Sequence, residues 1–362
     1  MKQRRFDLLG ARLRRQRLAG GGFANATEAV SAQLAVQAQD YLGALWGLGQ
    51  RVTGASESTI EQALAERSIV RAWPLRGTLH FVAAEDLRWL LDLLAPRLLQ
   101  RSRRRLKDDF DLDERVVERA RKVCERALEG GRALTREALY AAFDDARITT
   151  GGSRGLHLVW WLAHAGVLCF GTRVGKQHTF VNLDDWLPPT RRLSREAALA
   201  ELARRYFASR GPATLRDFAR WSGLPAADAA AAHEAVRREL AALDVDGRTY
   251  WCAADDEAGR GAKAPRVHLL PAYDEYTVAY ADRDAFLDVQ HATRAGNGIF
   301  KPALLVDGRI AGGWKRTLAK TTVDLVPDWF EPPTTTTMKA FDIAAARYAA
   351  FLEKTARGDP RA

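Results

Sequence analysis

The feature that most constrains the fold is a pattern that recurs three times: a polar start, a helix, a short break, a second helix and a β-like hairpin. The clearest copy lies past the middle of the chain. There Thr214 predicts an N-cap, Gly223 ends the first helix, and a second helix is expected over 226–240. The run 243–252 reads as two strands around Asp246-Gly247, a strong hairpin signal. Helix, turn, helix and hairpin is the winged-helix arrangement.

An earlier copy is expected within residues 26–82. Its helices and strands are predicted over 40–51, 58–66, 69–73 and 77–82. The apolar spacing in the first two ranges has a helical period, whereas the last two are rich in β-branched and aromatic residues.

The middle copy is expected within residues 134–186. Thr135 opens its first helix, Gly151-Gly152 breaks the pattern, and residues 153–165 form the second helix. The segment 167–181 predicts a hairpin with a basic tip.

These copies predict an α+β fold of three tandem winged-helix units followed by a β-rich C-terminal part. Pro188-Pro189 and the polar, Gly-rich segment 255–265 mark boundaries. In the C-terminal part, strands are expected over 267–271, 303–306 and 309–314, and a helix over 338–355. The predicted domains are 1–130 (unit with flanking helices), 131–190, 191–255 and 266–362.

Composition narrows the class of protein. The chain is 47% hydrophobic and 28% charged, as in ordinary globular proteins, and its net charge of +10 favours a polyanionic partner such as nucleic acid. An arginine-rich composition without functional meaning is the alternative. Three cysteines without CxxC spacing predict reduced thiols and no zinc site. No apolar run is long enough for a membrane span, and no export signal is evident, so a cytoplasmic location is expected.

Gln37-Ala38-Gln39, directly before the helix expected from Asp40, is the first candidate for chemistry. In extended backbone, residues two apart point to the same side, so both amides would converge. Each amide carries an acceptor and a donor, and two of them can orient a water molecule without adding charge. The alternative is that both glutamines simply cover the surface.

Basic residues gather in three places where phosphate contacts are expected. The alternatives are a solvated helix face and an ordinary surface hairpin. The tip of the middle hairpin also carries His178. The candidates for DNA binding are Arg101, Arg103 and Arg104 in one run, Arg173 and Lys176 at that tip, and Lys301, Arg309, Lys315 and Arg316 around an Asp307-Gly308 hairpin expected to enter a groove.

Asp274 and Glu275 are a second, competing pair of catalytic candidates. Adjacent carboxylates between aromatic residues could include a general base whose pKa burial raises. The alternative, which the apolar flanks favour, is a packed strand end where a carboxylate accepts hydrogen bonds from an arginine such as Arg283.

Four motifs together resemble the AlkZ-like DNA glycosylases over residues 8–320. They are Gln37-Ala-Gln39, the Arg71–His80 run with its Arg-Gly-Thr-Leu-His step, Leu269–Tyr276 with its Tyr-Asp-Glu-Tyr step, and Tyr280-Ala-Asp-Arg283. The resemblance implies a monofunctional enzyme that hydrolyses the N-glycosidic bond of N7-alkylated purines, including interstrand crosslinks, with Gln37 and Gln39 as catalytic residues. Gln rather than Asp at position 39 resembles the branch that protects antibiotic producers from their own alkylating products.

The expected enzyme needs no cofactor or metal and acts on double-stranded DNA, and three non-identical units in one chain favour a monomer over a dimer. Two other classes fit the sequence pattern. A winged-helix transcription regulator would bind DNA without catalysis, and a lesion binder would shield adducts without releasing the base.

Overall fold

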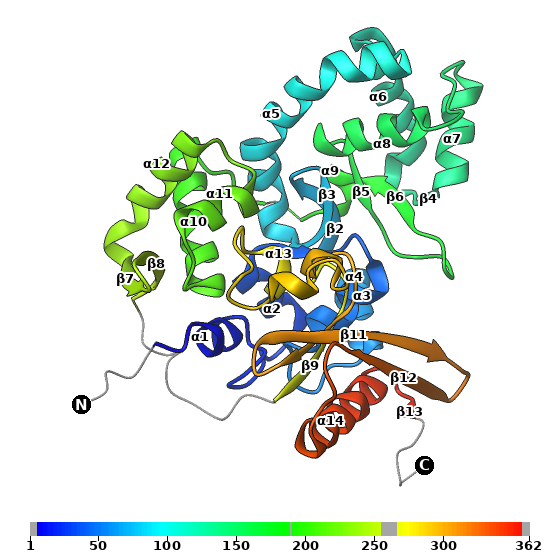
Figure 1. Ribbon diagram of the computed structural model, residues 1–362. Coiled ribbons are helices and arrows are strands. Elements are labelled where there is room, and N and C mark those ends of the chain that lie inside the picture. Colours follow the sequence, from blue (N-terminus) through cyan, green and yellow to red (C-terminus); the bar gives the residue numbers. More distant parts are fainter. Residues whose placement is uncertain (1–5, 189, 255–265, 357–362) are drawn as a thin grey trace. The chain divides into compact units, whose positions relative to one another are not determined.

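The computed structural model describes residues 6–188, 190–254 and 266–356. The chain is mixed α+β, as expected, and divides into two compact units (Figure 1). Unit 1 comprises Met1–Glu61 and Leu199–Ala362, and unit 2 comprises Gln62–Ala198. The four domains predicted from the sequence are drawn from repeats and linkers and not from compactness, and they remain a prediction.

Unit 2 contains the elements expected for the middle copy. Thr135 caps the first helix of that copy by accepting from the Ala138 N–H at 3.2 Å. Fully buried Phe143 and Leu162 lie in the hydrophobic core of this unit. The antiparallel hairpin β2–β3 precedes a sheet of order β4-β6-β5. The elements are β2 (Ile69–Leu75), β3 (Thr78–Ala83), α5 (Ala84–Phe110), α6 (Glu114–Leu128), β4 (Leu134–Thr135), α7 (Arg136–Asp145), α8 (Arg154–His164), β5 (Leu168–Phe170), β6 (Thr179–Asn182) and α9 (Leu183–Trp186).

The helices α11 (Leu215–Ser222) and α12 (Ala226–Val236) carry the last copy of the pattern in unit 1. Thr214 and Asp217 form a reciprocal capping box at the start of α11, and Gly223 ends it at φ 74°. The hairpin β7 (Leu240–Val245) and β8 (Arg248–Ala253) turns at Asp246-Gly247.

The expectation that the second helix reaches residue 240 is wrong. The α-helix ends at Val236, a 3₁₀ turn follows over Arg237–Glu239, and Leu240 already pairs with Ala253 in the hairpin. Strand pairing therefore overrides the helical tendency of the intervening residues.

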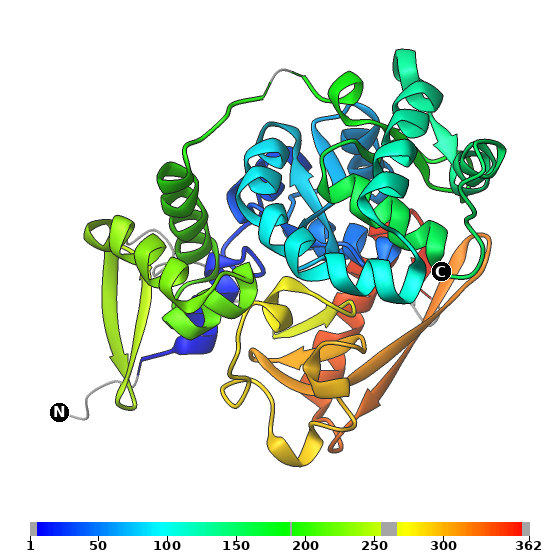
Figure 2. The same cartoon turned by 90° about the horizontal axis from the view of Figure 1, so that it is seen from above.

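Unit 1 also holds a five-stranded sheet of order β13-β12-β11-β10-β9, on which α14 packs (Figure 1). Its β11–β12 pair forms a long ribbon (Figure 2). The strand expected over 309–314 extends to Leu318 as β11. The helix expected from residue 338 begins three residues earlier because Thr334 caps it. The elements are β9 (Val267–Leu270), α13 (Glu275–Val278), β10 (Ala303–Val306), β11 (Arg309–Leu318), β12 (Thr322–Trp329), α14 (Thr335–Phe351) and β13 (Thr355–Ala356).

The remaining helices and a short strand lie near the N-terminus or lead into α11. The two helices expected over 40–51 and 58–66 are present within a few residues of those ranges. The elements are α1 (Leu8–Arg15), α2 (Ala26–Gln33), β1 (Val36–Gln37), α3 (Tyr41–Gly49), α4 (Glu57–Ala65) and α10 (Arg195–Arg210), with 3₁₀ turns at Glu129–Gly131, Val289–His291 and Gly296–Gly298.

The boundary segment 255–265 and Pro189 lie outside the described residues. Cys124, Cys169 and Cys252 are buried free thiols. In the part of the chain that the structure describes, no helix combines the length and the hydrophobicity of a membrane span.

Candidate active site around Gln37

The Gln-x-Gln segment connects α2 to α3. Strand β1 covers only Val36–Gln37, and Gln39 lies in a bend before the helix. Asp40 caps α3 by accepting from the Gly43 N–H at 3.2 Å. Gln37 is 9% exposed and Gln39 is exposed. The relative orientation of the two amides stays a prediction.

A rare turn precedes the glutamines. Leu34, at the end of α2, has φ 64° and ψ −48°, and the Ala35 N–H donates to the Gln33 carbonyl at 2.7 Å. This is the geometry of a γ-turn with positive φ, which is strained for a residue with a Cβ and costs about 1–3 kcal/mol. Leu34 is fully buried, so surrounding contacts must hold the turn.

Arg210, the last residue of α10, supplies those contacts. Its Nη1 donates to the Gln33 carbonyl and its Nη2 to the Ala35 carbonyl, each at 2.7 Å, so the guanidinium bonds both sides of the turn. Further bonds run from Nη1 to Ser209 Oγ at 2.8 Å, and from Nε and Nη2 to Glu275 Oε2 at 3.0 and 2.6 Å. All five guanidinium N–H groups can be used in this way. The arginine side chain is 0% exposed.

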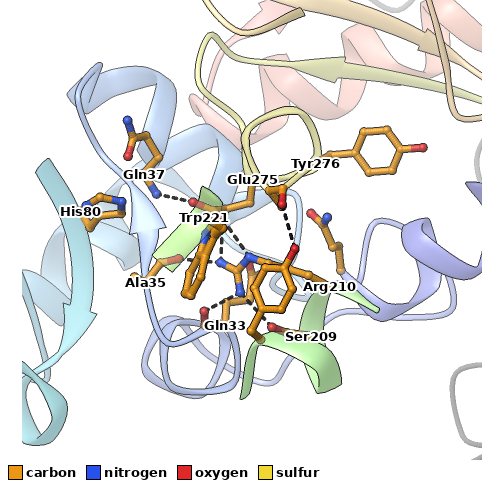
Figure 3. Close-up of polar contacts among 12 residues, drawn as sticks. Gln33, Ala35, Gln37, His80, Ser209, Arg210, Trp221, Glu275 and Tyr276 are labelled. Atoms are coloured by element: carbon orange, nitrogen blue, oxygen red, sulfur yellow. Dashed lines mark hydrogen bonds and ion pairs between the residues drawn. The ribbon is translucent and has the colours of Figure 1, made fainter. Parts of the chain in front are cut away.

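Glu275 completes the arrangement from the first position of α13. Its Oε1 accepts from the backbone N–H of Gln37 at 2.8 Å, while Oε2 accepts from Arg210 and from Trp221 Nε1 at 3.1 Å. Figure 3 shows Arg210 and Trp221 meeting at the Glu275 carboxylate, which in turn reaches the Gln37 backbone, while the Gln37 side chain points away from Glu275. Removing one partner of such a buried pair costs about 3–5 kcal/mol, because the other charge is left unpaired.

Asp274 forms a separate buried ion pair. Both of its carboxylate oxygens accept from Arg51, at 2.8 and 2.9 Å, and Oδ1 also caps α13 through the Tyr276 N–H. The sequence correctly predicts that an arginine pairs with these carboxylates, but Arg283 is the wrong one. Asp274 pairs with Arg51, and Glu275 pairs with Arg210. The carboxylates also begin a short helix rather than end a strand.

The basic run on α5 is exposed. Arg103 pairs with Glu114 and Arg104 with Asp108, and Arg101 is exposed on the same helix. Exposed ion pairs of this kind contribute little to the free energy of folding. Breaking them so that these arginines can bind phosphate therefore costs little.

The hairpin tip in unit 2 is less positive than its sequence indicates. Arg173 is half-buried and Lys176 is exposed, but burial, together with the nearby Arg71 and Arg173, lowers the pKa of His178 to about 4. The neutral ring accepts from Arg71 Nη1 at 3.1 Å. His178 therefore carries no positive charge at neutral pH.

The four basic candidates near the Asp307-Gly308 turn do not form one cluster. Gly308 is buried, and its carbonyl accepts from the Tyr276 hydroxyl at 2.8 Å, whereas Asp307 and Arg309 on either side of it are exposed. Lys301 bonds the Arg294 carbonyl, and Arg316 donates to the Tyr348 hydroxyl. Arg309 borders a cavity of about 950 Å³ that the other three candidates do not line.

Lys315 and Arg316 line a second cavity, of about 340 Å³. Asp40, the residue after Gln39, also lines it. Its other walls are apolar and aromatic. The lining residues are Asp40, Gly43, Trp46, Pro271, Ala272, Pro302, Trp314, Lys315 and Arg316. Among the described residues, no group of three or more His, Cys, Asp or Glu side chains is arranged to hold a metal ion.

Sequence reasoning missed Arg210, Trp221 and Arg51. Arg210 lies 65 residues from Glu275 in the chain, and nothing in the local pattern of α10 distinguishes it from the other arginines of that helix. Only the adjacent acidic residues at positions 274 and 275 hinted that buried arginines exist.

Comparisons with known proteins agree on one family. A family model described as DNA glycosylase AlkZ-like matches residues 30–351. An interstrand DNA cross-link repair glycosylase from Streptomyces sahachiroi is 26% identical over 366 residues, covering 93% of this chain and 94% of the relative. The solved structure of Streptomyces sahachiroi DNA glycosylase AlkZ is 22% identical with a TM-score of 0.78, covering 97% of this chain and 98% of that one, and it supports the fold.

Proposed function

The chain belongs to the AlkZ-like DNA glycosylase family, and from that premise we propose that it releases N7-alkylated purines from double-stranded DNA, including purines joined in interstrand crosslinks. The predicted family and enzyme class are thereby confirmed. The crosslink substrate is supported by the relative that matches over almost the whole chain, an interstrand DNA cross-link repair glycosylase.

Gln37 and Gln39 carry the reaction in this proposal. Alkylation at N7 leaves a positive charge on the base, so the base departs with little help from a general acid. The transition state is then oxocarbenium-like at the sugar. The two amides orient the attacking water, and their carbonyl dipoles stabilise the positive charge on the sugar. The reaction uses only protein side chains and water.

The observation that carries the assignment is the fixed position of the Gln37 backbone at the edge of solvent. A buried carboxylate holds its N–H, and the side chain retains 9% exposure. Asp274 and Glu275 are less suited to act as a base, because buried arginines occupy their oxygens.

We further propose that the three helix-turn-helix and hairpin segments are winged-helix units that contact DNA phosphates. The basic residues Arg101, Arg103, Arg104, Arg173 and Lys176 would serve this purpose, with Lys301, Arg309, Lys315 and Arg316 in the C-terminal part. Such contacts give affinity without sequence preference. Gln39 favours a role in self-resistance to an alkylating antibiotic.

The test is base release. The protein is incubated with DNA treated with a monofunctional and with a bifunctional alkylating agent, and abasic sites and free purine are measured. We expect release by the wild type and nearly none by Gln37→Ala or Gln39→Ala, with DNA affinity retained. Excision at the parental rate by both variants would refute the catalytic assignment, and an operator footprint without base release would establish a regulator.

A further inference from the structure

We propose that the buried Arg210–Glu275 ion pair positions the reactive glutamine segment, holding residues 33–37 in the backbone conformation that presents Gln37. The inference rests on the proposed catalytic role of Gln37. Arg210 and Glu275 act through the backbone and contact neither DNA nor water at the reacting sugar, so both are positioning residues.

The ion pair bonds the segment at three alternate residues. Arg210 donates to the carbonyls of Gln33 and Ala35, and Glu275 accepts from the N–H of Gln37. The three distances are 2.7, 2.7 and 2.8 Å. Because Arg210 and Glu275 are also bonded to each other, the three anchor points are fixed relative to one another (Figure 3).

The held conformation is one that the segment would not keep by itself. Leu34 has a positive φ, and its turn lies between the two carbonyls that Arg210 bonds. A strained turn persists only where its surroundings determine it, and such turns concentrate at functional sites. Relaxation of Leu34 would redirect the chain shortly before Gln37.

A role in stability alone does not account for the arrangement. Buried ion pairs generally stabilise a fold no better than apolar residues of similar volume. The neighbouring Arg51–Asp274 pair is equally buried, yet Arg51 bonds the Gly47 carbonyl within α3 and the Gln16 side chain. None of those bonds reaches residues 33–37, so this pair provides a matched control.

The experiment compares Arg210→Lys and Glu275→Gln with the control Arg51→Lys in the full chain. Lysine keeps the charge but cannot bond two carbonyls and a carboxylate in one plane. We expect the single-turnover excision rate of 7-methylguanine to fall about 100-fold in both test variants, because the glutamine is displaced. DNA affinity should be unchanged, and Arg51→Lys should excise at the wild-type rate.

Hydrogen exchange supplies a readout that a loss of global stability does not mimic. The backbone amides of residues 33–39 should exchange faster in Arg210→Lys and Glu275→Gln than in Arg51→Lys, while the other peptides of unit 1 exchange alike. If one test variant fails to fold, the excision rate and exchange of the other test variant decide whether the proposal holds. Wild-type excision by a folded variant, an equal loss in Arg51→Lys, or failure of both test variants to fold would each overturn the proposal.

Gln37→Ala, measured in parallel, separates this inference from the function on which it rests. If that variant excises normally, the catalytic role of Gln37 fails, while the exchange data still report whether the pair holds the segment. If it is inactive, Gln37→Ala/Arg210→Lys should be no slower than Gln37→Ala, because both changes act through one residue. A further loss in the double variant would contradict the inference.

Discussion

Asp274 and Glu275 are consecutive in the chain, yet their carboxylates pair with two different buried arginines, Arg51 and Arg210. The first pair joins α13 to α3, and the second joins it to α10 and to the glutamine segment. The Tyr-Asp-Glu-Tyr motif thus connects three parts of unit 1, the end of α3, the end of α10 and the glutamine segment, from the start of one short helix. Glu275 is bonded to the glutamine segment, whereas Asp274 is bonded to Arg51 and caps α13.

Excision should depend on the charge of the damaged base. Amide side chains are poor acids and bases, so the leaving group must already be activated. We expect 7-methylguanine to be released at least about 100-fold faster than a neutral lesion such as hypoxanthine, equivalent to about 3 kcal/mol in activation free energy. Single-turnover rates on two otherwise identical duplexes test this. Equal rates would indicate a general acid that protonates the base.

Phosphate contacts should be visible in the salt dependence of binding. We expect Arg101→Ala and Lys176→Ala each to reduce the slope of log K against log salt by about 1, with lesion preference unchanged. Lys122→Ala on α6 is the control, since Lys122 is an exposed residue outside the predicted set. An unchanged slope in the two test variants would leave Arg101 and Lys176 as solvated surface residues.

The cap of α3 should affect both stability and catalysis. Asp40→Ala removes the acceptor for the Gly43 N–H and should lower the free energy of unfolding by about 1 kcal/mol. Asp40→Asn retains a capping oxygen and should cost little. Urea unfolding measures the difference, and excision should follow the same order because Gln39 directly precedes the cap. A loss of excision in Asp40→Asn as large as that in Asp40→Ala would assign the carboxylate charge a role of its own.

His268 should make unit 1 sensitive to acid. Burial lowers its pKa to about 4, although the ring donates to the Leu18 carbonyl at 3.0 Å. The folded state therefore binds this proton more weakly than the unfolded state, whose pKa is about 6.5. The stabilisation is complete above pH 6.5 and declines as the pH falls to about 4, by roughly 3 kcal/mol in total. Unfolding free energies measured between pH 7 and 4.5 should decline less steeply in His268→Gln than in the wild type.

Local chemistry made much of the fold predictable. Thr214, Gly223 and Asp246-Gly247 were assigned correctly because a cap, a left-handed helix end and a tight turn each depend on the residue at that position. Where the end of an element depends on a distant partner, the expectation failed. Leu240 continues a helical pattern, but its pairing with Ala253 makes it a strand residue.

The residues of the candidate site also divide into those that a local pattern predicts and those that depend on distant partners. Gln37 and Gln39 stand out from the sequence because they are adjacent to a cap and a helix start. Arg210, which bonds the Gln33 and Ala35 carbonyls, does not stand out, since Arg283 is close in sequence to Glu275 whereas Arg210 is close in space. The choice among many arginines is made by packing, which no short motif records.

Unit 1 is built from both ends of the chain, and this has a consequence for its synthesis. A ribosome releases the N-terminal part first, so Gln37 emerges long before Glu275, which follows it by 238 residues. Until that carboxylate and Arg210 are both available, the nascent polypeptide lacks the three bonds that join them to residues 33, 35 and 37. On the proposed role of Gln37, a chain released before residue 275 is translated is expected to lack base-release activity.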